Sequence, residues 1–482
     1  MRLEPAQRTF FALLSQAVFA NPFSEARERI DARVAGVPKS TPWDVVLGRM
    51  LGVVAERLAE LGDRIDLRRW DDDDRELLEL AILFEVFHRF GPHFEGLIRE
   101  ETAGGRPRRV GFAKDVLRAL ERHGVERAEA CRYVALFWQL RRAYFFIERS
   151  LPGRTPSMRR LRESLWNNVF SSDVRLYAQT LWRKMEDFST FLLGETGSGK
   201  GAAAAAIGRS GFVPFDDKSE SFVTGFSESF LAIDLSQFSP GIVESELFGH
   251  KKGAFTGAVD AHPGVLQRCS AHGSIFLDEI GDVGIELQVK LLRVLQDRVF
   301  YPVGSHEAHR FRGRVIAATN RNVGELRAAG KFRDDFYYRL CSDVVRVPTL
   351  RERLREDPGE IDVLIGSILP RVVGEDSPAL RARVRGAIDQ NLGARYPWPG
   401  NVRELEQCVR RVLLTERCAP DERGAPDAAR LFDATGGGAW TADELLARYC
   451  RALYDRHGTY EEVARRAGLD RRTVKRYVER AF

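Results

Sequence analysis

A glycine-rich turn between two apolar runs is the feature that most restricts the fold of this chain. The run Phe191-Leu-Leu193 leads into Gly194-Glu-Thr-Gly-Ser-Gly-Lys200, and an alanine-rich, helix-forming run follows. A strand that passes through a glycine loop into a helix predicts a phosphate site, because backbone N–H groups at the helix N-terminus face the anion and Lys200 reaches the outer phosphates. The candidate phosphate-binding residues are Gly194, Glu195, Thr196, Gly197, Ser198, Gly199, Lys200 and Gly201.

A second apolar run ends in two carboxylates. Ser274-Ile-Phe-Leu-Asp-Glu279 predicts a buried strand, with Asp278 suited to hold Mg²⁺ directly or through water and Glu279 suited to orient and deprotonate an attacking water. The usual Mg²⁺-binding Ser or Thr after the loop lysine is replaced by Gly201, so the metal needs another ligand. A fortuitous glycine turn and a solvated strand end are the alternatives to a nucleotide site.

The chain divides into five segments by texture, and its 482 residues exceed what one core normally holds. Residues 1–155 predict a helical bundle with an aromatic core, in which one helix begins near Asp71–Asp74 and ends at Gly91. Residues 156–345 predict an α/β region with a parallel sheet, and 346–418 are helical again. Residues 419–440 predict a linker and 441–482 a small helical unit. The expected fold class is therefore multidomain α and α/β.

Hydropathy predicts where the protein is located, whereas net charge does not identify its partners. The formal net charge of +5 is slight for this length and does not decide whether the chain binds nucleic acid. No apolar run approaches the ~18 residues of a membrane span, and the charged N-terminus resembles an amphipathic helix more than a signal peptide. We expect a cytoplasmic protein that has no membrane partner.

A loop with an aromatic tip is predicted at Gly249–Ala261, which reads GHKKGAFTGAVDA. Phe255 lies between Gly253 and Gly257 and has no apolar partner at helical or strand spacing, so periodicity gives no reason to bury it. The glycines permit turns that other residues resist. The sequence therefore predicts an exposed aromatic tip on a turned loop.

Seven motifs together resemble the central domain of the sigma-54-dependent transcription activators, also called bacterial enhancer-binding proteins, which are AAA+ ATPases. They occur in the family's order over about residues 156–418: GETGSGK, ESELFGHKKGAFTGA, SIFLDEIGD, QVKLLRVLQD, VIAATN, FRDDFYYRL and WPGNVREL. The resemblance implies ATP and Mg²⁺ as cofactors and a homo-oligomeric ring, usually a hexamer, with a helical lid at 346–418. It also implies that the loop contacts sigma-54 of RNA polymerase, through Gly253, Ala254, Phe255, Thr256, Gly257 and Ala258.

The resemblance also assigns residues beside the phosphate loop. Asn320 matches the first sensor residue, which responds to the γ-phosphate, and Arg403 matches the second sensor at the start of a lid helix. Arg333 and Arg339 match the arginines that reach a neighbouring subunit's nucleotide, a role that suits a planar and permanently charged guanidinium. Surface salt bridges are the alternative for both arginines.

Two residues depart from the family's pattern. Gly201 stands where the family usually has Glu, a change that we do not expect to abolish activity. Asp234 stands where the family usually has an Asn that holds the catalytic Glu. An ionised Asp accepts hydrogen bonds but does not donate them, and two close carboxylates repel, so coupling between nucleotide state and loop movement is expected to be altered.

The last forty or so residues predict three helices with helix-turn-helix spacing, the second helix of the motif beginning near Asp470. Basic residues exceed acidic ones there, which favours DNA over a solvated basic helix, and this segment resembles the family's Fis-like DNA-binding domain. Val474 and Tyr477 are predicted to pack or to touch a thymine methyl. The candidate DNA contacts are Arg471, Arg472, Thr473, Lys475 and Arg476.

The sequence therefore predicts a transcription regulator that binds DNA, forms a ring and uses ATP hydrolysis to remodel sigma-54 RNA polymerase, with residues 1–155 as a regulatory domain. One alternative is a DNA-bound regulator that uses ATP only for assembly, hydrolysis having been lost through Asp234 and Gly201. The other is an AAA+ remodeller of a different protein target.

Overall fold

The computed structural model describes residues 1–62, 64–104, 109–393, 396–418 and 441–479. The described residues of Met1–Arg385 and Gly400–Arg410 form one compact unit, and those of Gly386–Pro399 and Arg411–Phe482 form a second. The linker predicted at 419–440 lies outside the described residues.

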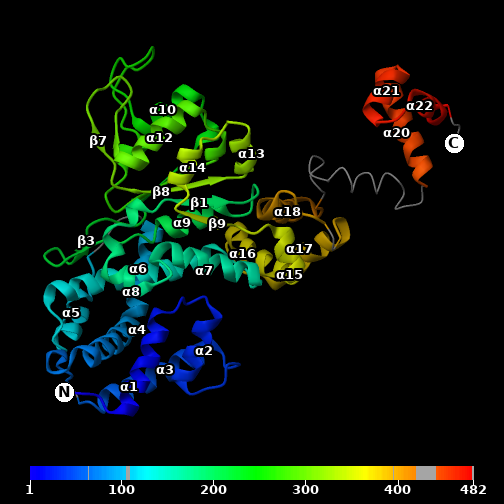
Figure 1. Cartoon of the computed structure of the whole chain (residues 1–482). Coiled ribbons are helices and arrows are strands. Elements are labelled where there is room, and N and C mark those ends of the chain that lie inside the picture. The colour runs from blue at the N-terminus through cyan, green and yellow to red at the C-terminus, as the bar shows by residue number, and fades with distance from the viewer. Residues whose placement is uncertain (63, 105–108, 394–395, 419–440, 480–482) are drawn as a thin grey trace. The chain divides into compact units, whose positions relative to one another are not determined.

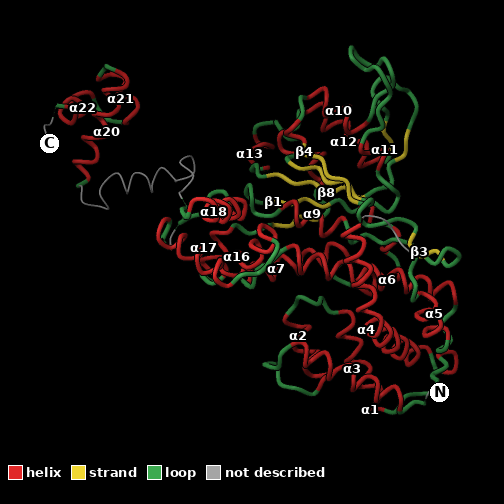
Figure 2. The backbone as a smooth tube through the Cα atoms, turned by 180° about the vertical axis from the view of Figure 1, so that it is seen from behind, coloured by secondary structure: helices red, strands yellow, loops and turns green. Residues whose placement is uncertain are grey.

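A five-stranded parallel sheet forms the centre of the first unit (Figure 2). The strands stand in the order β4 (Phe230–Asp234), β5 (Ser274–Asp278), β8 (Arg314–Thr319), β1 (Thr190–Leu193) and β9 (Asp343–Arg346). The three apolar runs predicted as strands are β5, β8 and β1, which are neighbours in this sheet. The predicted α/β class is confirmed, and the parallel order brings the carboxyl ends of all five strands to one edge.

Alternate side chains of the central strands enter two different hydrophobic clusters. Leu192 and Ile316 pack with helix α9 (Lys200–Gly208), whereas Phe191 and Ala317 pack with helices α10 (Pro240–Phe248), α12 (Ile285–Asp297) and α14 (Asp334–Leu340). The period of two residues along a strand sends neighbours to opposite faces. Figure 1 shows the result, with α9 on one side of the sheet and α10, α12 and α14 on the other.

The helices before the sheet share one continuous core with it. The hydrophobic cluster that contains α9 extends from Leu3 to Val347, so packing continues across residue 155. Figure 1 shows α6 and α7 lying along the α9 side of the sheet. The helices of this region are α1 (Pro5–Phe19), α2 (Glu25–Ala35), α3 (Trp43–Ala59), α4 (Asp72–Gly104), α5 (Ala113–Glu121), α6 (Arg127–Ser150), α7 (Pro156–Phe170) and α8 (Val174–Gln179).

Helix α4 corrects one expectation from the sequence. It begins beside the predicted acidic residues but continues through Gly91 and Pro92 to Gly104. Phe94 and Ile98, beyond the proline, are fully buried in the core, and Phe94 meets the ring of Trp138 at a centroid distance of 6.2 Å. Burial of large apolar side chains there outweighs the helix-breaking preferences of the two residues.

The remaining elements are short or follow the sheet. They are β2 (Phe215–Asp216), β3 (Ser221–Phe222), α11 (Val265–Arg268), β6 (Val299–Phe300), β7 (His309–Arg310), α13 (Val323–Ala328), α15 (Leu350–Glu356), α16 (Glu360–Val373), α17 (Pro378–Asn391), α18 (Asn401–Thr415), α20 (Ala442–His457), α21 (Tyr460–Ala467) and α22 (Arg471–Val478). Within the described ranges, no helix is long and apolar enough to cross a membrane.

Candidate nucleotide site

The glycine loop between β1 and α9 packs closely against the lid. Gly197 has φ +76°, and a Cβ on it would lie 2.2 Å from the backbone oxygen of Gly400. The Gly197 oxygen accepts a hydrogen bond of 3.1 Å from the N–H of Val402. Only glycine combines this backbone conformation with this approach, so the loop and the start of α18 hold one another in place.

Lys200 lies at the first position of α9 with its side chain almost completely buried. Its Nζ donates to the backbone oxygens of Gly194 at 2.9 Å and Glu195 at 3.3 Å. The same Nζ lies 4.0 Å from Oε1 of Glu279. The loop lysine and the predicted general base therefore belong to one site, although they are far apart in the sequence.

The predicted catalytic carboxylates gather at the carboxyl edge of β4 and β5. Asp234 and Asp278 are register partners at the ends of these strands. Burial first, and the nearby negative charge of Asp234 among the further causes, raise the pKa of Asp278. Burial also tends to raise the pKa of Asp234, but hydrogen bonds from Ser236 and Gln237 outweigh it and leave that pKa below its usual value.

Glu279 has a backbone conformation that is unusual for a side-chain-bearing residue, with φ 54°. Its Oε2 accepts a hydrogen bond of 3.2 Å from the N–H of Asn320, and burial raises its pKa. The Asn320 side chain in turn donates to Oγ1 of Thr196 in the phosphate loop at 2.7 Å. Asn320 thus connects the predicted base with the phosphate loop.

Asp234 lies next to Asp278 in the register of the sheet, and not next to Glu279. Both oxygens of Asp234 accept hydrogen bonds from its own segment, from Ser236 and Gln237, while Glu279 is bound by Asn320. Hydrogen-bond donors next to a charged carboxylate favour its ionised form. The sequence predicted that the charge of Asp234 lies beside Glu279. In the structure it lies instead beside Asp278, the candidate metal ligand.

Two lid residues that the sequence did not single out hold the phosphate loop. Arg351 of α15 donates to Oε1 of Glu195 at 2.7 Å. Asn401 at the start of α18 is fully buried, and its Nδ2 donates to Oε2 of Glu195 and to the oxygen of Thr196, both at 3.1 Å. Asn401 lies inside the WPGNVREL motif, so the motif could have indicated that this residue has a role. Its contact with the phosphate loop depends on tertiary packing, which the sequence does not show.

The three predicted arginines occupy different positions. Arg403 is exposed, and its charge acts to lower the pKa values of both Asp234 and Asp278, which places it beside the carboxylates. Arg333 pairs with Asp335 at 2.7 Å. Arg339 donates to the backbone oxygen of Leu295 at 2.9 and 3.0 Å. Within the described residues, Arg333 and Arg339 make no hydrogen bond to the phosphate loop of their own chain.

The carboxylates suit a Mg²⁺ ion that is bound jointly by the protein and by the phosphates of a nucleotide. Among the described residues, no group of three or more His, Cys, Asp or Glu could hold a metal ion. Mg²⁺ is usually bound through one or two carboxylates together with waters and substrate phosphates. Asp278, with a raised pKa and Asp234 as its register partner, is a site where a cation would relieve repulsion.

The predicted aromatic loop forms a turned hairpin between α10 and α11. Gly253 and Gly257 have φ +79° and +102°, and the Gly253 N–H donates to the Ala258 oxygen at 2.8 Å. Phe255 is 47% exposed, and the centroid of its ring lies 4.9 Å from that of His250 in the same hairpin. The tip is therefore a solvent-accessible aromatic group on a short, internally bonded loop.

Helices α20, α21 and α22 form a separate small core. Gly468, with φ +65°, ends α21, and the side chain of Asp470 caps α22 by accepting from the N–H of Thr473 at 2.9 Å. Val474 and Tyr477 are buried in this core, so of the two roles the sequence allowed, they pack. On the same helix, Arg471, Arg472, Lys475 and Arg476 are exposed.

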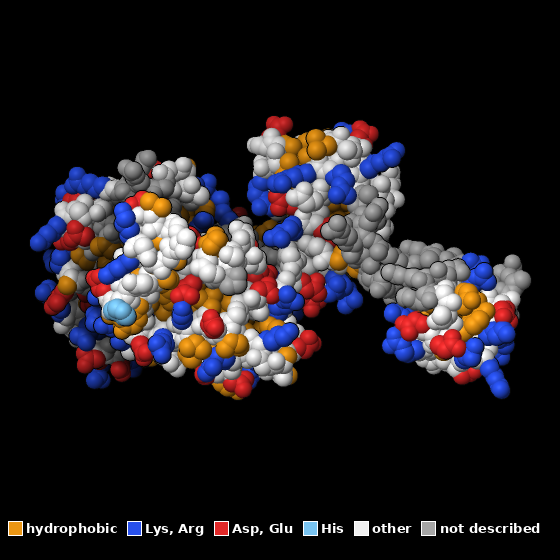
Figure 3. All heavy atoms as spheres, turned by 90° about the horizontal axis from the view of Figure 1, so that it is seen from above, with side chains coloured by type: hydrophobic (Ala, Val, Ile, Leu, Met, Phe, Trp, Pro, Cys, Tyr) orange, Lys and Arg blue, Asp and Glu red, His pale blue; other side chains and the backbone are white. Residues whose placement is uncertain are grey.

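The exposed basic residues of α22 are only partly neutralised. Arg471 pairs with Glu461 at 2.9 Å and Lys475 with Glu479 at 3.7 Å. Figure 3 shows blue basic side chains among red acidic ones on the visible face of this unit. Exposed ion pairs contribute little, so phosphates can replace the carboxylates as partners.

A glycine loop after β1, a carboxylate pair after β5 and an asparagine after β8 converge at one sheet edge, and a helical lid contacts the loop. This arrangement defines a nucleotide-binding α/β domain of the AAA+ class. Residues 171–346 match the family described as "Sigma-54 interaction domain". The resemblance predicted from the motifs is confirmed: the central domain of this chain is a sigma-54 interaction domain.

Curated relatives share this region. The chain is 35% identical to the Nif-specific regulatory protein of Azotobacter vinelandii, over 57% of this chain and 46% of that protein. It is 34% identical to the C4-dicarboxylate transport transcriptional regulatory protein DctD of Rhizobium meliloti, over 69% of this chain and 65% of that protein. It is also 34% identical to the transcriptional regulatory protein ZraR of Escherichia coli, over 67% of this chain and 66% of that protein. The matched region is less than two thirds of each relative's own length.

Solved structures are more distant. NtrX from Brucella abortus in complex with ATP aligns with a TM-score of 0.41 at 21% identity, over 77% of this chain and 81% of that chain. With so low a TM-score, the alignment supports no further conclusion about the fold or function of this chain.

Proposed function

We propose that this protein is a sigma-54-dependent transcription regulator that binds DNA through α20–α22 and hydrolyses ATP in a homo-oligomeric ring, expected to be a hexamer. Hydrolysis would move the loop around Phe255 against sigma-54 RNA polymerase. The observation that carries the proposal is the convergence of Lys200, Glu279 and Asn320 at one sheet edge of a sigma-54 interaction domain. A cytoplasmic location follows from this role.

Each residue of the site has a distinct task in this proposal. Lys200 binds the outer phosphates, and Glu279 orients a water and accepts its proton. Asn320 reports the state of the γ-phosphate to Glu279 through the hydrogen bond that they share. Asp278 would hold Mg²⁺, and the ion would supply positive charge beside the phosphates. Arg333 and Arg339 would act on the nucleotide of a neighbouring subunit.

The hydrolysing reading is favoured over assembly without hydrolysis. Asp234 is bound by Ser236 and Gln237, and Glu279 is positioned by Asn320, so neither departure from the family pattern displaces the predicted base. Gly201 lies in the first turn of α9, and a Cβ there would meet only the Phe276 ring at 4.0 Å. Neither residue gives a physical reason for lost turnover.

The test combines steady-state ATP hydrolysis with open-complex formation at a sigma-54 promoter. We expect both activities from the full-length chain. ATP-dependent assembly without hydrolysis would favour the assembly-only regulator. Hydrolysis together with no binding to sigma-54 in the presence of an ATP transition-state analogue would favour a remodeller of another protein.

A further inference from the structure

The N-terminal helices enclose a cavity of about 370 Å³ that the nucleotide site does not use. Its walls come from α1, α2, α3, α4, α6, α7 and α8. They carry mostly apolar and aromatic side chains, among them Phe84, Phe87, Phe137, Tyr144 and Trp166. Concave apolar sites of this size, with a few polar groups, are typical of small-molecule binding. Flat rings on several walls suit a flat ligand, because aromatic pairs gain from offset or edge contacts.

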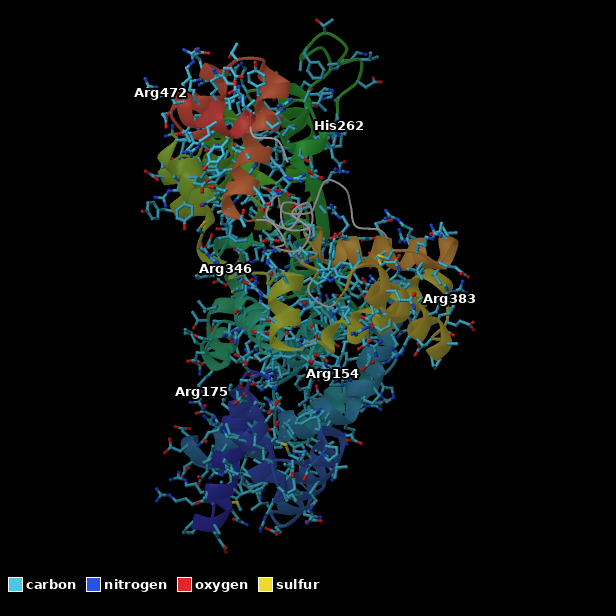
Figure 4. The ribbon with its side chains drawn as sticks, turned by 90° about the vertical axis from the view of Figure 1, so that its right-hand side faces the viewer. Arg154, Arg175, His262, Arg346, Arg383 and Arg472 are labelled. Carbon is cyan, nitrogen blue, oxygen red and sulfur yellow. The ribbon has the colours of Figure 1, made fainter. Side chains whose placement is uncertain are left out.

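The arginines that line the cavity each have a carboxylate partner already. Arg27 pairs with the buried Asp31 at 2.6 Å, Arg141 shares Glu95 with two other arginines, and Arg132 and Arg175 also have partners. Figure 4 labels Arg175 at the level where α8 meets the N-terminal helices. A ligand carboxylate would therefore have to compete for cations that already have partners.

Glu79 and His88 are polar groups of the lining that a ligand could bind, and the buried Nε1 of Trp166, which has no hydrogen-bond partner among the described residues, is another. Glu79 forms no salt bridge within the described residues and accepts a hydrogen bond of 2.6 Å from the Tyr133 hydroxyl. A carboxylate accepts several hydrogen bonds, so a donor on the ligand can bind the same group. Burial, with the charges of Arg27 and Arg141, lowers the pKa of His88 to about 3, so its imidazole is neutral.

Helix α6 connects this cavity with the nucleotide site. One side of α6 lines the cavity with Tyr133 and Phe137. Its other side is hydrogen-bonded to the residues that follow α9. Gln139 donates to the backbone oxygen of Ser210 at 3.0 Å. The buried Arg142 donates to the backbone oxygens of Arg209 and Gly211, both at 2.7 Å. Since α9 begins at Lys200, a shift of α6 displaces the helix that carries the phosphate-binding lysine.

We propose that this cavity is an effector site for a flat, mainly apolar small molecule that bears a hydrogen-bond donor and no negative charge, and that its occupancy changes nucleotide affinity through α6 and α9. The proposal goes beyond the function above, since it places the regulatory input in a particular cavity and gives the chemistry that the cavity accepts.

The experiment measures binding of two probes to the full-length protein by calorimetry. Indole is neutral and has one N–H donor, whereas indoleacetate has the same rings and a carboxylate. We expect indole to bind and indoleacetate to bind about tenfold more weakly or not at all. Saturating indole should change the affinity for ADP by about fivefold or more, since couplings between sites commonly change affinities by factors of about 5–150.

Filling the cavity should remove both effects. Ala178 of α8 lines the cavity, so Ala178→Phe should lower indole affinity about tenfold or more. Ala128→Phe adds the same ring at an exposed position of α6 outside the cavity and should leave binding unchanged. If Ala178→Phe fails to fold, Leu47→Trp fills the cavity from α3. Glu79→Gln should narrow the preference for indole over indoleacetate, because it removes the negative charge.

Four outcomes would overturn the proposal: no binding of indole, tighter binding of indoleacetate, equal loss of binding in Ala178→Phe and Ala128→Phe, or an ADP affinity that indole leaves unchanged. The assays involve neither sigma-54 nor DNA. Failure here therefore leaves the proposed transcriptional function intact, and failure of open-complex formation leaves the cavity result intact.

Discussion

Asp234 and Asp278 stand opposite one another at the ends of neighbouring parallel strands, and only one of them has strong hydrogen-bond support. Asp234 receives donors from Ser236 and Gln237, which keep its pKa low, whereas burial and the charge of Asp234 raise the pKa of Asp278. The cost of holding two carboxylates together therefore falls on Asp278, the residue proposed to bind Mg²⁺. Strain of this kind is common where function requires a charge that folding would avoid.

Asp278→Asn should stabilise the protein at neutral pH. Since the folded pKa of Asp278 lies above its ordinary value of 3.8, protonation favours the folded state: this stabilisation is complete below 3.8 and is lost as the pH rises through the raised pKa. At neutral pH the ionised group is destabilising, and its removal should add roughly 0.5–2 kcal/mol. Urea unfolding across the acidic range should show the gain shrinking as the pH falls. Asp260→Asn, at an exposed loop position, is the control and should show no gain.

Glu279→Gln tests the assignment of the general base. The variant keeps the shape of the side chain and the hydrogen bond from Asn320, so nucleotide binding should be largely intact. Turnover should fall by roughly 10²–10⁴ if Glu279 removes the proton from water. Glu286→Gln, on the exposed first turn of α12, should keep the original rate. Lys200→Ala should instead weaken nucleotide binding, and an unchanged rate in Glu279→Gln would refute the assignment.

Arg142→Met tests the contact between α6 and α9. Methionine retains an apolar stem but leaves the partly buried backbone oxygens of Arg209 and Gly211 without their donors. A fully buried unpaired acceptor costs about 1–3 kcal/mol, so two partly buried ones should together lower the free energy of unfolding by about 1 kcal/mol or more. Arg118→Met, on an exposed arginine of α5, is the matched control. Equal stabilities of the two variants would show that α6 does not hold α9.

The same contact affects experiments that remove residues 1–155. Because α9 and the N-terminal helices share one hydrophobic cluster, deletion would expose apolar side chains of the ATPase core as well as removing a regulatory segment. A changed ATPase rate after deletion would therefore not by itself show regulation. Point substitutions such as Arg142→Met, which leave the core covered, separate the two effects.

Sequence patterns predicted the parts of the site that follow from chain-local rules. The ends of β1, β5 and β8 were recognisable because apolar runs stopped at glycines, acids or Asn320. The contacts from Arg351 and Asn401 to Glu195 were not, because they join segments more than 150 residues apart through the packing of the lid. The extension of α4 past Gly91 was missed for the same reason, since the buried Phe94 beyond it decides the outcome.

Lys475→Ala tests DNA binding by α22. Lys475 is exposed, and among the described residues it pairs with Glu479 at 3.7 Å, so its charge is available to a phosphate. Loss of one phosphate contact should flatten the salt dependence of binding by about one unit in the log–log slope. Lys218→Ala, an exposed lysine of the first unit, should leave the slope unchanged. A chain that stops before Thr441 should lose specific binding, and retention of DNA by this truncation would refute the assignment.

Phe255→Ala tests whether the loop tip transmits the work of hydrolysis. Phe255 is 47% exposed, so its loss should cost much less than the ~3–5 kcal/mol of a buried Phe. The residues of the nucleotide site lie in other segments, so ATP hydrolysis should remain substantial. Binding to sigma-54 in the ATP-dependent state and open-complex formation should both be lost, as they should in Thr256→Ala.

The control for this last comparison lies in the same loop. Val259 is 72% exposed, and Val259→Ala removes apolar surface without changing the aromatic tip. It should retain hydrolysis, thermal stability and open-complex formation. All three quantities are measured on one preparation of each variant, because a loss of open complexes has meaning only where ATPase rate and folding are preserved. Normal open-complex formation by Phe255→Ala would show that the exposed ring is not the contact with sigma-54 RNA polymerase, and that the loop acts through its backbone or not at all.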